Sequence, residues 1–293
     1  MNKNVYILIA LLVVLLIAAY YVLKMPGESD SNSEHSTIFL SVDSAATDGI
    51  EIKSPSTDVK LERKGNTWYV TAPVHYRADQ KSVEDAIHQC KILSVLNLVS
   101  DKPEKFSIFQ VDSTGTRISL FQGGKATSAF IVGKTSPNFT DSYVRKAGAN
   151  QVMLARGVLE YTFNRQLKEW RDRTIISVSR EEIKSIAVQN GKDSYQLMLR
   201  DSVWMLDGKR VKLSAVNDLI ASLSNFQADD FLDSAVTPAP KTSSRISFAG
   251  LQLRFAENGK DGYYVQSSTS SQWYIVEGWH AKEIFKSRKD LLE

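Results

Sequence analysis

Apolar residues are arranged in two different ways along this chain of 293 residues. The first arrangement is a continuous 19-residue run, Val5–Leu23, that contains no charged residue. A helix of this length spans roughly the 30 Å hydrocarbon core of a bilayer. The run is longer than the apolar part of a secretory signal, and bulky residues stand where small ones would mark a cleavage site. It predicts an uncleaved signal anchor over residues 1–24.

The charges around Val5–Leu23 predict its orientation. The α-amino group and Lys3 precede the run and Lys24 follows it, and basic residues are more frequent on the cytoplasmic side of a span. Residues 25–37 are rich in Ser, Pro, Gly and acids, so we interpret them as a flexible stalk. We therefore expect a single-pass protein with most of its chain on the extracytoplasmic side.

The second arrangement is periodic, and it occurs twice. Residues 78–97 and 212–227 each place apolar side chains on one face of a predicted helix. Each helix follows a short strand that carries a tryptophan, Trp68 or Trp204. The two apolar faces match residue for residue at an offset of 133: Val83, Ala86, Ile87, Cys90 and Leu93 against Val216, Leu219, Ile220, Leu223 and Phe226.

A further match at an offset of 121 links residues 142–157 to residues 263–278. Alternating segments predict strands, and terminal helices are expected near Gly157 and Gly278. The strand segments are 59–62, 116–122, 129–133, 195–199, 245–255 and 263–266. Strands broken by single helices are typical of the α+β class. We predict two copies of an antiparallel-sheet-plus-helix unit, over residues 38–176 and 177–293.

Composition narrows the classes of function. Hydrophobic residues make up 43% of the chain and charged residues 24%, as in ordinary globular proteins. Setting aside Lys3 and Lys24 leaves 34 basic residues against 33 acidic ones. A nucleic-acid-binding protein needs an excess of basic charge, so this balance argues against that class. The single cysteine, Cys90, excludes an intramolecular disulfide.

Candidate metal and nucleophile residues are few. Glu84 and His88 share one helical face, and His280 lies near Glu283, but two ligands do not complete a structural zinc site. A solvated polar face explains Glu84 and His88 equally. Cys90 matches Leu223 in the other copy, so we interpret it as a core residue.

The remaining motifs also have structural explanations. The acidic cluster of Asp229, Asp230 and Asp233 lacks the glycine and the closing glutamate of a calcium loop. The Gly123-Gly124-Lys125 segment predicts a hairpin turn. Asn138-Phe139-Thr140 fits the short glycosylation pattern. Most tryptophans, among them Trp170, Trp273 and Trp279, are expected in the core. The sequence thus predicts no catalytic, cofactor-binding or metal-binding residue and no enzyme activity.

A succession of short motifs resembles the bacterial "domain of unknown function 4340" family. The motifs are Trp68-Tyr69-Val70-Thr71-Ala72-Pro73, Ala78-Asp79, Phe106-Ser107-Ile108, Ile131-Val132-Gly133-Lys134, Tyr143-Val144-Arg145 and Trp170-Arg171-Asp172-Arg173-Thr174-Ile175. The resemblance covers residues 50–186 well and the second copy more loosely. Ser107 stands where the family usually has glycine.

The resemblance implies a protein anchored in the bacterial inner membrane and exposed to the periplasm. Such domains occur beside subunits of ABC-type transport systems, including those linked to gliding motility. We therefore expect a non-enzymatic accessory or scaffold protein with protein partners in such a complex. The alternative is a binding module for an envelope ligand, held in a cleft between the two copies.

Overall fold

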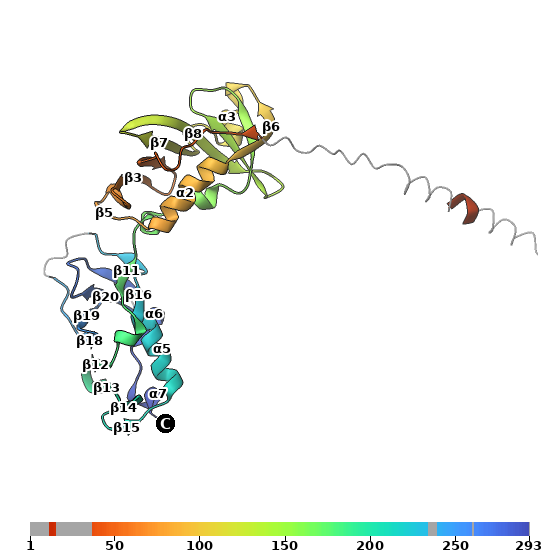
Figure 1. Ribbon diagram of the computed structural model, residues 1–293. Coiled ribbons are helices and arrows are strands. Elements are labelled where there is room, and N and C mark those ends of the chain that lie inside the picture. The colour runs from red at the N-terminus through yellow and green to blue at the C-terminus, as the bar shows by residue number, and fades with distance from the viewer. Residues whose placement is uncertain (1–11, 16–36, 234–238, 260, 293) are drawn as a thin grey trace, which may run out of the picture. The chain divides into compact units, whose positions relative to one another are not determined.

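The structure is a computed structural model that describes residues 12–15, 37–233, 239–259 and 261–292 (Figure 1). The predicted anchor over residues 1–24 and the stalk over residues 25–37 lie outside the described residues, except for 12–15 and Thr37. Among the described residues, no helix has the length and apolar character of a membrane span.

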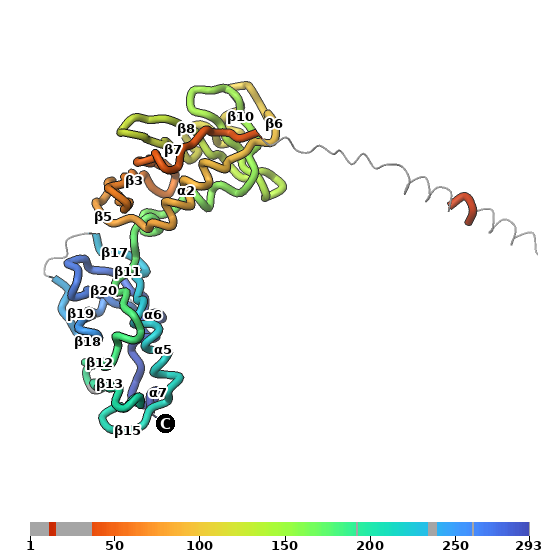
Figure 2. The backbone as a smooth tube through the Cα atoms, viewed as in Figure 1, coloured from red at the N-terminus to blue at the C-terminus, as the bar shows by residue number. Residues whose placement is uncertain are grey.

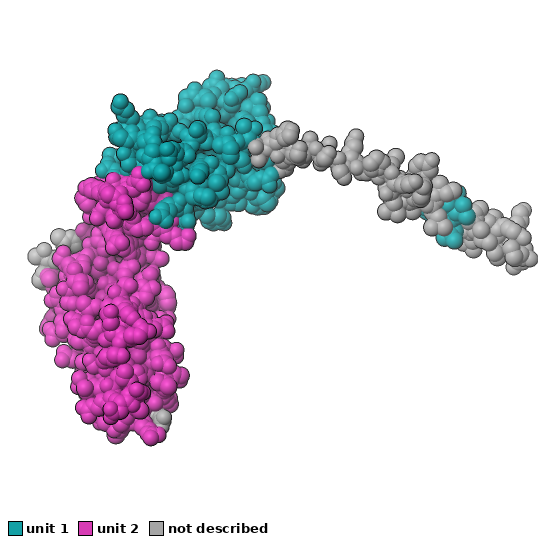
Figure 3. Space-filling view, in the orientation of Figure 1, with its two compact units in different colours: residues 1–62, 84–165 teal, residues 63–83, 166–293 magenta. Residues whose placement is uncertain are grey.

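The chain divides into two compact units (Figure 3). Unit 1 comprises the residues up to Glu62 together with Glu84–Arg165. Unit 2 comprises Arg63–Val83 and Gln166–Glu293.

The first large sheet has ten strands in the order β1-β6-β10-β9-β8-β7-β2-β3-β4-β5. The strands are β1 (Thr37–Ile38), β2 (Gly49–Lys53), β3 (Asp58–Lys64), β4 (Thr67–Ala72), β5 (Tyr76–Arg77), β6 (Ser94–Ser100), β7 (Thr116–Gln122), β8 (Lys125–Thr135), β9 (Asp141–Lys146) and β10 (Val152–Arg156). The helical segments along this part of the chain are α2 (Gln80–Ile92), η1 (Pro103–Lys105), α3 (Phe106–Phe109), α4 (Glu160–Phe163) and η2 (Leu167–Trp170).

The second large sheet has nine strands in the order β15-β14-β13-β12-β18-β19-β20-β21-β17, and β11 and β16 form a separate pair. The strands are β11 (Thr174–Ser177), β12 (Ser185–Gln189), β13 (Tyr195–Arg200), β14 (Val203–Leu206), β15 (Lys209–Arg210), β16 (Asn225–Gln227), β17 (Asp230–Phe231), β18 (Ser244–Phe248), β19 (Leu251–Glu257), β20 (Gly262–Ser267) and β21 (Tyr274–Glu277). The helical segments are η3 (Arg180–Glu182), η4 (Gly191–Asp193), α5 (Leu213–Ser224), α6 (Gly278–Ile284) and α7 (Arg288–Leu291). Figure 2 follows the chain through β18, β19 and β20 in turn.

The two large sheets have the same strand order. Read from β5, the first runs β5-β4-β3-β2-β7-β8-β9-β10-β6 and ends with one additional strand, β1; read from β15, the second runs β15-β14-β13-β12-β18-β19-β20-β21-β17. Apart from β1, four strands of each sheet precede one long helix, α2 or α5, and the other five strands follow it. The prediction of antiparallel sheets with a few helices, an α+β arrangement, is confirmed.

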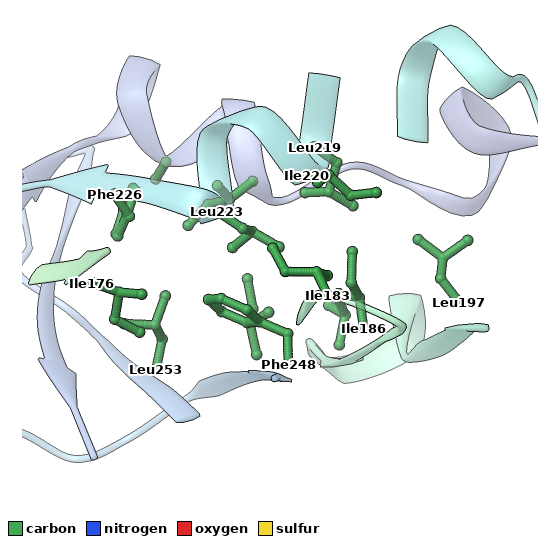
Figure 4. Close-up of a cluster of buried hydrophobic side chains, with 14 of the residues drawn as sticks. Ile176, Ile183, Ile186, Leu197, Leu219, Ile220, Leu223, Phe226, Phe248 and Leu253 are labelled. Carbon is green, nitrogen blue, oxygen red and sulfur yellow. The ribbon is translucent and has the colours of Figure 1, made fainter. Parts of the chain in front are cut away.

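Alternating apolar residues build a core on one face of each sheet. In unit 1 the inward residues of the central strands include Ile52, Ile118 and Phe130, none of which is exposed to solvent. In unit 2 the apolar face of α5 packs over the strands, as Figure 4 shows for Leu219, Ile220, Leu223, Phe248 and Leu253. Burial of one such side chain contributes roughly 1.5–3 kcal/mol to stability.

Both predicted helices are too long at their C-terminal ends. α2 ends at Ile92 rather than near Asn97, because Ser94–Ser100 forms β6 and pairs with β10. α5 ends at Ser224, because Asn225–Gln227 forms β16 and pairs with β11. In each case the apolar pattern continues from the helix into a strand, and pairing with a distant strand decides the conformation.

The predicted hairpin at Gly123-Gly124 joins β7 to β8. Both glycines have positive φ, 57° and 74°, as the central residues of a type I′ turn require. Residues 245–255, predicted as strand, contain a second hairpin, because Ala249 and Gly250 have φ of 47° and 73° and separate β18 from β19.

Candidate functional site

Three of the motif segments noted in the sequence meet in unit 1. The turn at Phe106, the β8 segment at Ile131 and the β9 segment at Arg145 are widely separated along the chain. Ile131 is paired with Arg145 across β8 and β9. The Arg145 guanidinium carbon lies 4.1 Å from the centroid of the Phe106 ring. The three motifs therefore lie together on one face of the sheet, and Ile118 and Phe130 point to the other face.

Two glycines allow the Phe106 turn to approach this face. A Cβ atom at Gly133 would lie 2.1 Å from the carbonyl oxygen of Phe109. A Cβ atom at Gly115 would lie 2.2 Å from the carbonyl oxygen of Gln110. Any side chain at these positions would push the turn away from the sheet. The close approach explains why the Ile131–Lys134 motif contains glycine.

Pairing register places three basic residues in one row across four strands. Lys53 on β2 is opposite Arg117 on β7, Arg117 is opposite Ile131 on β8, and Ile131 is opposite Arg145 on β9. Residues directly opposite each other in a sheet point to the same face, and neighbouring strands lie about 4.8 Å apart. The row therefore carries Lys53, Arg117 and Arg145 on one face of unit 1.

A cavity of about 820 Å³ lies over this row. Its lining combines the basic row with the Ser54-Pro55 turn, the start of β3 and the loop before β7. The lining residues are Lys53, Ser54, Pro55, Asp58, Asp112, Ser113, Thr114, Gly115, Arg117, Ile131 and Arg145. It offers guanidinium and ammonium groups, two carboxylates, three hydroxyls and a small apolar floor. We call it the arginine cavity.

Arg145 is held in place from several sides. Its Nε donates to the carbonyl oxygen of Val111 at 2.9 Å, and its Nη1 donates to the carbonyl oxygen of Ala149 at 3.0 Å. Burial lowers the pKa of the Arg145 guanidinium from its ordinary value, and the like charge of Arg117 lowers it further. The Arg117 side chain is exposed, and it makes no hydrogen bond or ion pair within the described residues.

Asp112 supplies negative charge at the wall of the arginine cavity. Its carboxylate accepts hydrogen bonds from the Thr114 hydroxyl at 2.6 Å and the Thr114 backbone N–H at 3.0 Å. These bonds hold the pKa of Asp112 below its ordinary value, with a smaller contribution from Arg145. Asp112 is therefore ionised at neutral pH, and the cavity is lined by both basic and acidic groups.

In unit 2, the Arg171-Asp172 motif forms a structural junction. The Arg171 side chain is 2% exposed, and its Nη1 donates to both carboxylate oxygens of Asp233 at 2.8 Å. Its guanidinium carbon lies 3.5 Å from the Phe231 ring centroid and 4.5 Å from that of Tyr76. A buried guanidinium is tolerated only when it is paired in this way.

Neighbouring groups complete this junction. The Tyr76 and Tyr274 hydroxyls form a 2.8 Å hydrogen bond, and burial raises the pKa of Tyr76 from its ordinary value. The backbone N–H of Asp172 donates to the carbonyl oxygen of Arg77. Trp170 is fully buried, as expected. Every motif group here has a packing or pairing role.

The predicted acidic cluster is divided among three side-chain partners. Asp229 accepts a hydrogen bond from the Glu277 backbone N–H and lies 3.1 Å from Nδ1 of His280. Asp230 lies 3.5 Å from Nζ of Lys168, and Asp233 is the partner of Arg171. The carboxylates do not converge on one point.

The other sequence candidates are also placed by the structure. Cys90 is a free, fully buried thiol on α2, and burial raises its pKa to about 12. Glu84 and His88 are exposed on the opposite side of that helix. Within the described part of the chain, no group of three or more His, Cys, Asp or Glu residues is arranged to hold a metal ion.

One tryptophan expected in the core, Trp279, is exposed instead, and two other aromatic residues are exposed in unit 1. Trp279 is 61% exposed; it stacks on His280 and donates from Nε1 to Glu277. In unit 1, Phe139 is 79% exposed and Tyr161 is 81% exposed. Tryptophan or phenylalanine content alone does not reveal which rings the fold leaves outside.

The fold and site define an α+β protein with two antiparallel sheets and a polar, arginine-lined cavity. The family model described as Domain of unknown function (DUF4340) matches residues 68–245, which is more than half of the chain. The chain therefore belongs to this family, as its motifs predict. No curated protein and no solved structure matches it.

Proposed function

We propose that this protein is a non-enzymatic, membrane-anchored accessory or scaffold subunit of an ABC-type transport or envelope-assembly complex. Residues 1–24 would anchor it in the bacterial inner membrane, with the two sheets on the periplasmic side. The uncharged Val5–Leu23 run supports the anchor, and the family resemblance supports the class of complex.

The observation that carries this proposal is a pair of exposed aromatic rings in unit 1. Phe139 lies in the loop between β8 and β9, and Tyr161 lies on α4. The Gly157 backbone N–H donates to the carbonyl oxygen of Thr140 at 3.1 Å, so the two segments are joined at the same end of the sheet. Exposed aromatic residues are characteristic of protein–protein contact surfaces.

The loop that presents Phe139 is held by its own hydrogen bonds. The Asn138 side-chain amide donates to Asp141 at 2.8 Å, and the Ser136 hydroxyl donates to the Asp141 carbonyl oxygen at 3.0 Å. Phe139 has φ of 60°, which is uncommon for a bulky residue. A ring held outward in this way loses little conformational entropy on binding a partner.

Two reactive or charged groups of the sequence motifs, Cys90 and Arg171, support a non-catalytic role because they serve the fold. The Cys90 thiol is buried, and Arg171 is paired with Asp233 between two rings. Tethering supports a scaffold role, since confinement to one membrane surface raises the effective concentration of a weakly bound partner.

We also propose that the two large sheets are copies of one ancestral unit. Their identical strand order and the matched apolar faces of α2 and α5 support this duplication. In an experimental structure, superposing residues 48–175 on residues 183–290 should pair Val83 with Val216 and Ile87 with Ile220. Non-equivalent positions of these helices would exclude duplication.

The test of the scaffold role is crosslinking of the full chain in native membranes, followed by mass spectrometry. The expected product contains a permease or ATPase subunit of a transport complex. The double substitution Phe139→Ala and Tyr161→Ala should reduce this product at least about tenfold, because interface aromatics carry large shares of binding energy.

The matched control substitutes two exposed apolar residues of unit 2, Val203→Ala and Leu213→Ala, which are 51% and 60% exposed. These changes should leave the crosslinked product unchanged. Equal losses in both variants would contradict a specific surface in unit 1. Full activity of an untethered, monomeric chain on a soluble substrate would contradict the scaffold role altogether.

A further inference from the structure

The basic row of unit 1 breaks a rule of sheet stability. Lys53 and Arg117 are directly opposite each other on β2 and β7, and like charges in that arrangement are destabilising. Glu51, 3.3 Å from Lys53, and Asp58, directly opposite Lys53 on β3, offset the charge of Lys53. Arg117 makes no such pair among the described residues, and its charge acts on Arg145. Local conflicts of this kind are expected at functional sites.

The guanidinium of Arg145 is prepared for a ligand. The two backbone carbonyls and the Phe106 ring fix its plane, so little rotamer entropy remains to be lost on binding. A guanidinium is suited to the planar, charged oxygens of carboxylate and phosphate groups. Together, Arg117 and Arg145 form an anion-binding side of the arginine cavity.

Acidic and hydroxyl groups also line the arginine cavity and select a different chemistry. Asp58 is directly opposite Lys53 across β2 and β3, and Asp112 lies close enough to Arg145 for each to affect the pKa of the other. The hydroxyls of Ser54 and Thr114 belong to the same lining. Ionised Asp112 would repel a second anionic group but accept hydrogen bonds from ligand hydroxyls. The volume, about 820 Å³, is that of a site for an organic molecule rather than a single small ion.

From this arrangement we propose that the arginine cavity binds an acidic saccharide, one whose ring carries hydroxyls and a single phosphate or carboxylate group. The anionic group lies against Arg117 and Arg145. The ring lies over Ile131 and Pro55, and its hydroxyls donate to Asp58 and Asp112. This site does not depend on the scaffold role proposed above.

The second large sheet contains a row of residues that can be compared with the basic row of unit 1. Its equivalent row is Gln189, Arg245, Arg254 and Gln266, by the same strand order and register. There Gln266 replaces Arg145, and its side-chain oxygen accepts a hydrogen bond from Nη2 of Arg254 at 2.5 Å. Arg245 therefore occupies the position of Arg117, but its row has glutamine in place of Arg145, and its neighbour Arg254 is hydrogen-bonded to that glutamine. It is a matched control for the charge of Arg117.

The experiment is calorimetric titration of the purified full chain in detergent with glucose 6-phosphate, glucuronate, glucose and inorganic phosphate. We expect binding of glucose 6-phosphate or glucuronate, and the stronger of the two identifies the anionic group. Glucose should not bind, and inorganic phosphate should bind at least tenfold more weakly than the better sugar. Affinity should fall as salt concentration rises.

Arg117→Gln should reduce the affinity for the better sugar at least tenfold, whereas Arg245→Gln should leave it unchanged. Because both arginines are exposed, neither variant should lower the melting temperature. Three results would overturn the proposal: no binding of either anionic sugar at millimolar concentration, equal binding of glucose, or equal losses in the two variants. None of these results bears on the crosslinking of the Phe139 and Tyr161 surface.

Discussion

Cys90 shows how the surroundings of a residue decide its role. It lies on the buried face of α2, where burial raises the pKa of its thiol to about 12. At neutral pH the thiol is therefore protonated and is a poor nucleophile. The residue at the matched position of α5, Leu223, is also fully buried. Both side chains fill space between helix and sheet.

Cys90→Ala should lower the free energy of unfolding by about 1–2 kcal/mol at pH 7, through lost packing. The difference between wild type and variant should narrow above about pH 9. There the thiol ionises in the unfolded chain but stays protonated in the folded chain, so wild-type stability falls as pH rises. Urea denaturation at pH 7 and pH 10 measures both effects. Loss of function without loss of stability would contradict the packing role.

At the element scale, local pattern predicts most of the fold. The alternation of apolar and polar residues predicts β3, β7, β8 and β13. The helical spacing of apolar residues predicts the buried faces of α2 and α5. The C-terminal ends of both helices were predicted wrongly because β6 and β16 are fixed by pairing with distant strands. An apolar pattern over a few residues fits either conformation.

The candidate site was much less predictable than the fold. The sequence motifs contain Arg145 and Phe106 but do not identify them as members of a site, and no sequence pattern identifies Lys53 or Arg117. Their position in one row depends on the register among β2, β7, β8 and β9. Register is a property of the assembled sheet, and a shift of one residue would place each side chain on the other face.

Gly133→Ala tests the packing of the Phe106 turn on β8. The added methyl group would lie 2.1 Å from the Phe109 carbonyl oxygen, so the turn must move. We expect a loss of about 2–4 kcal/mol in the free energy of unfolding. Gly124→Ala is the control: its φ is 74° and no atom lies within 4 Å of the added methyl, so only backbone strain of about 1 kcal/mol is expected. Equal losses would show that the turn does not pack closely.

At the scale of the whole molecule, the near balance of 34 basic and 33 acidic residues outside Lys3 and Lys24 provides no long-range electrostatic steering. Recognition must then depend on local surfaces, such as the exposed rings of Phe139 and Tyr161 or the arginine cavity. A tether compensates for weak local contacts by holding the chain near its partners. The proposed stalk over residues 25–37 would give a reach of about 20 Å as a flexible 13-residue chain.

The predicted tether can be tested in cells. The full chain should sediment with membranes and resist extraction by carbonate, because the uncharged Val5–Leu23 run favours the hydrocarbon core. A C-terminal reporter that is active only outside the cytoplasm should give signal. Val14→Arg with Ile17→Arg should release the chain or block its export, since each central arginine costs about 2.5–3.5 kcal/mol on insertion. The paired control, Val14→Leu with Ile17→Leu, should behave as wild type. Extraction of the wild-type chain by carbonate, or a mature N-terminus beyond Leu23, would show that residues 1–24 are not a permanent anchor.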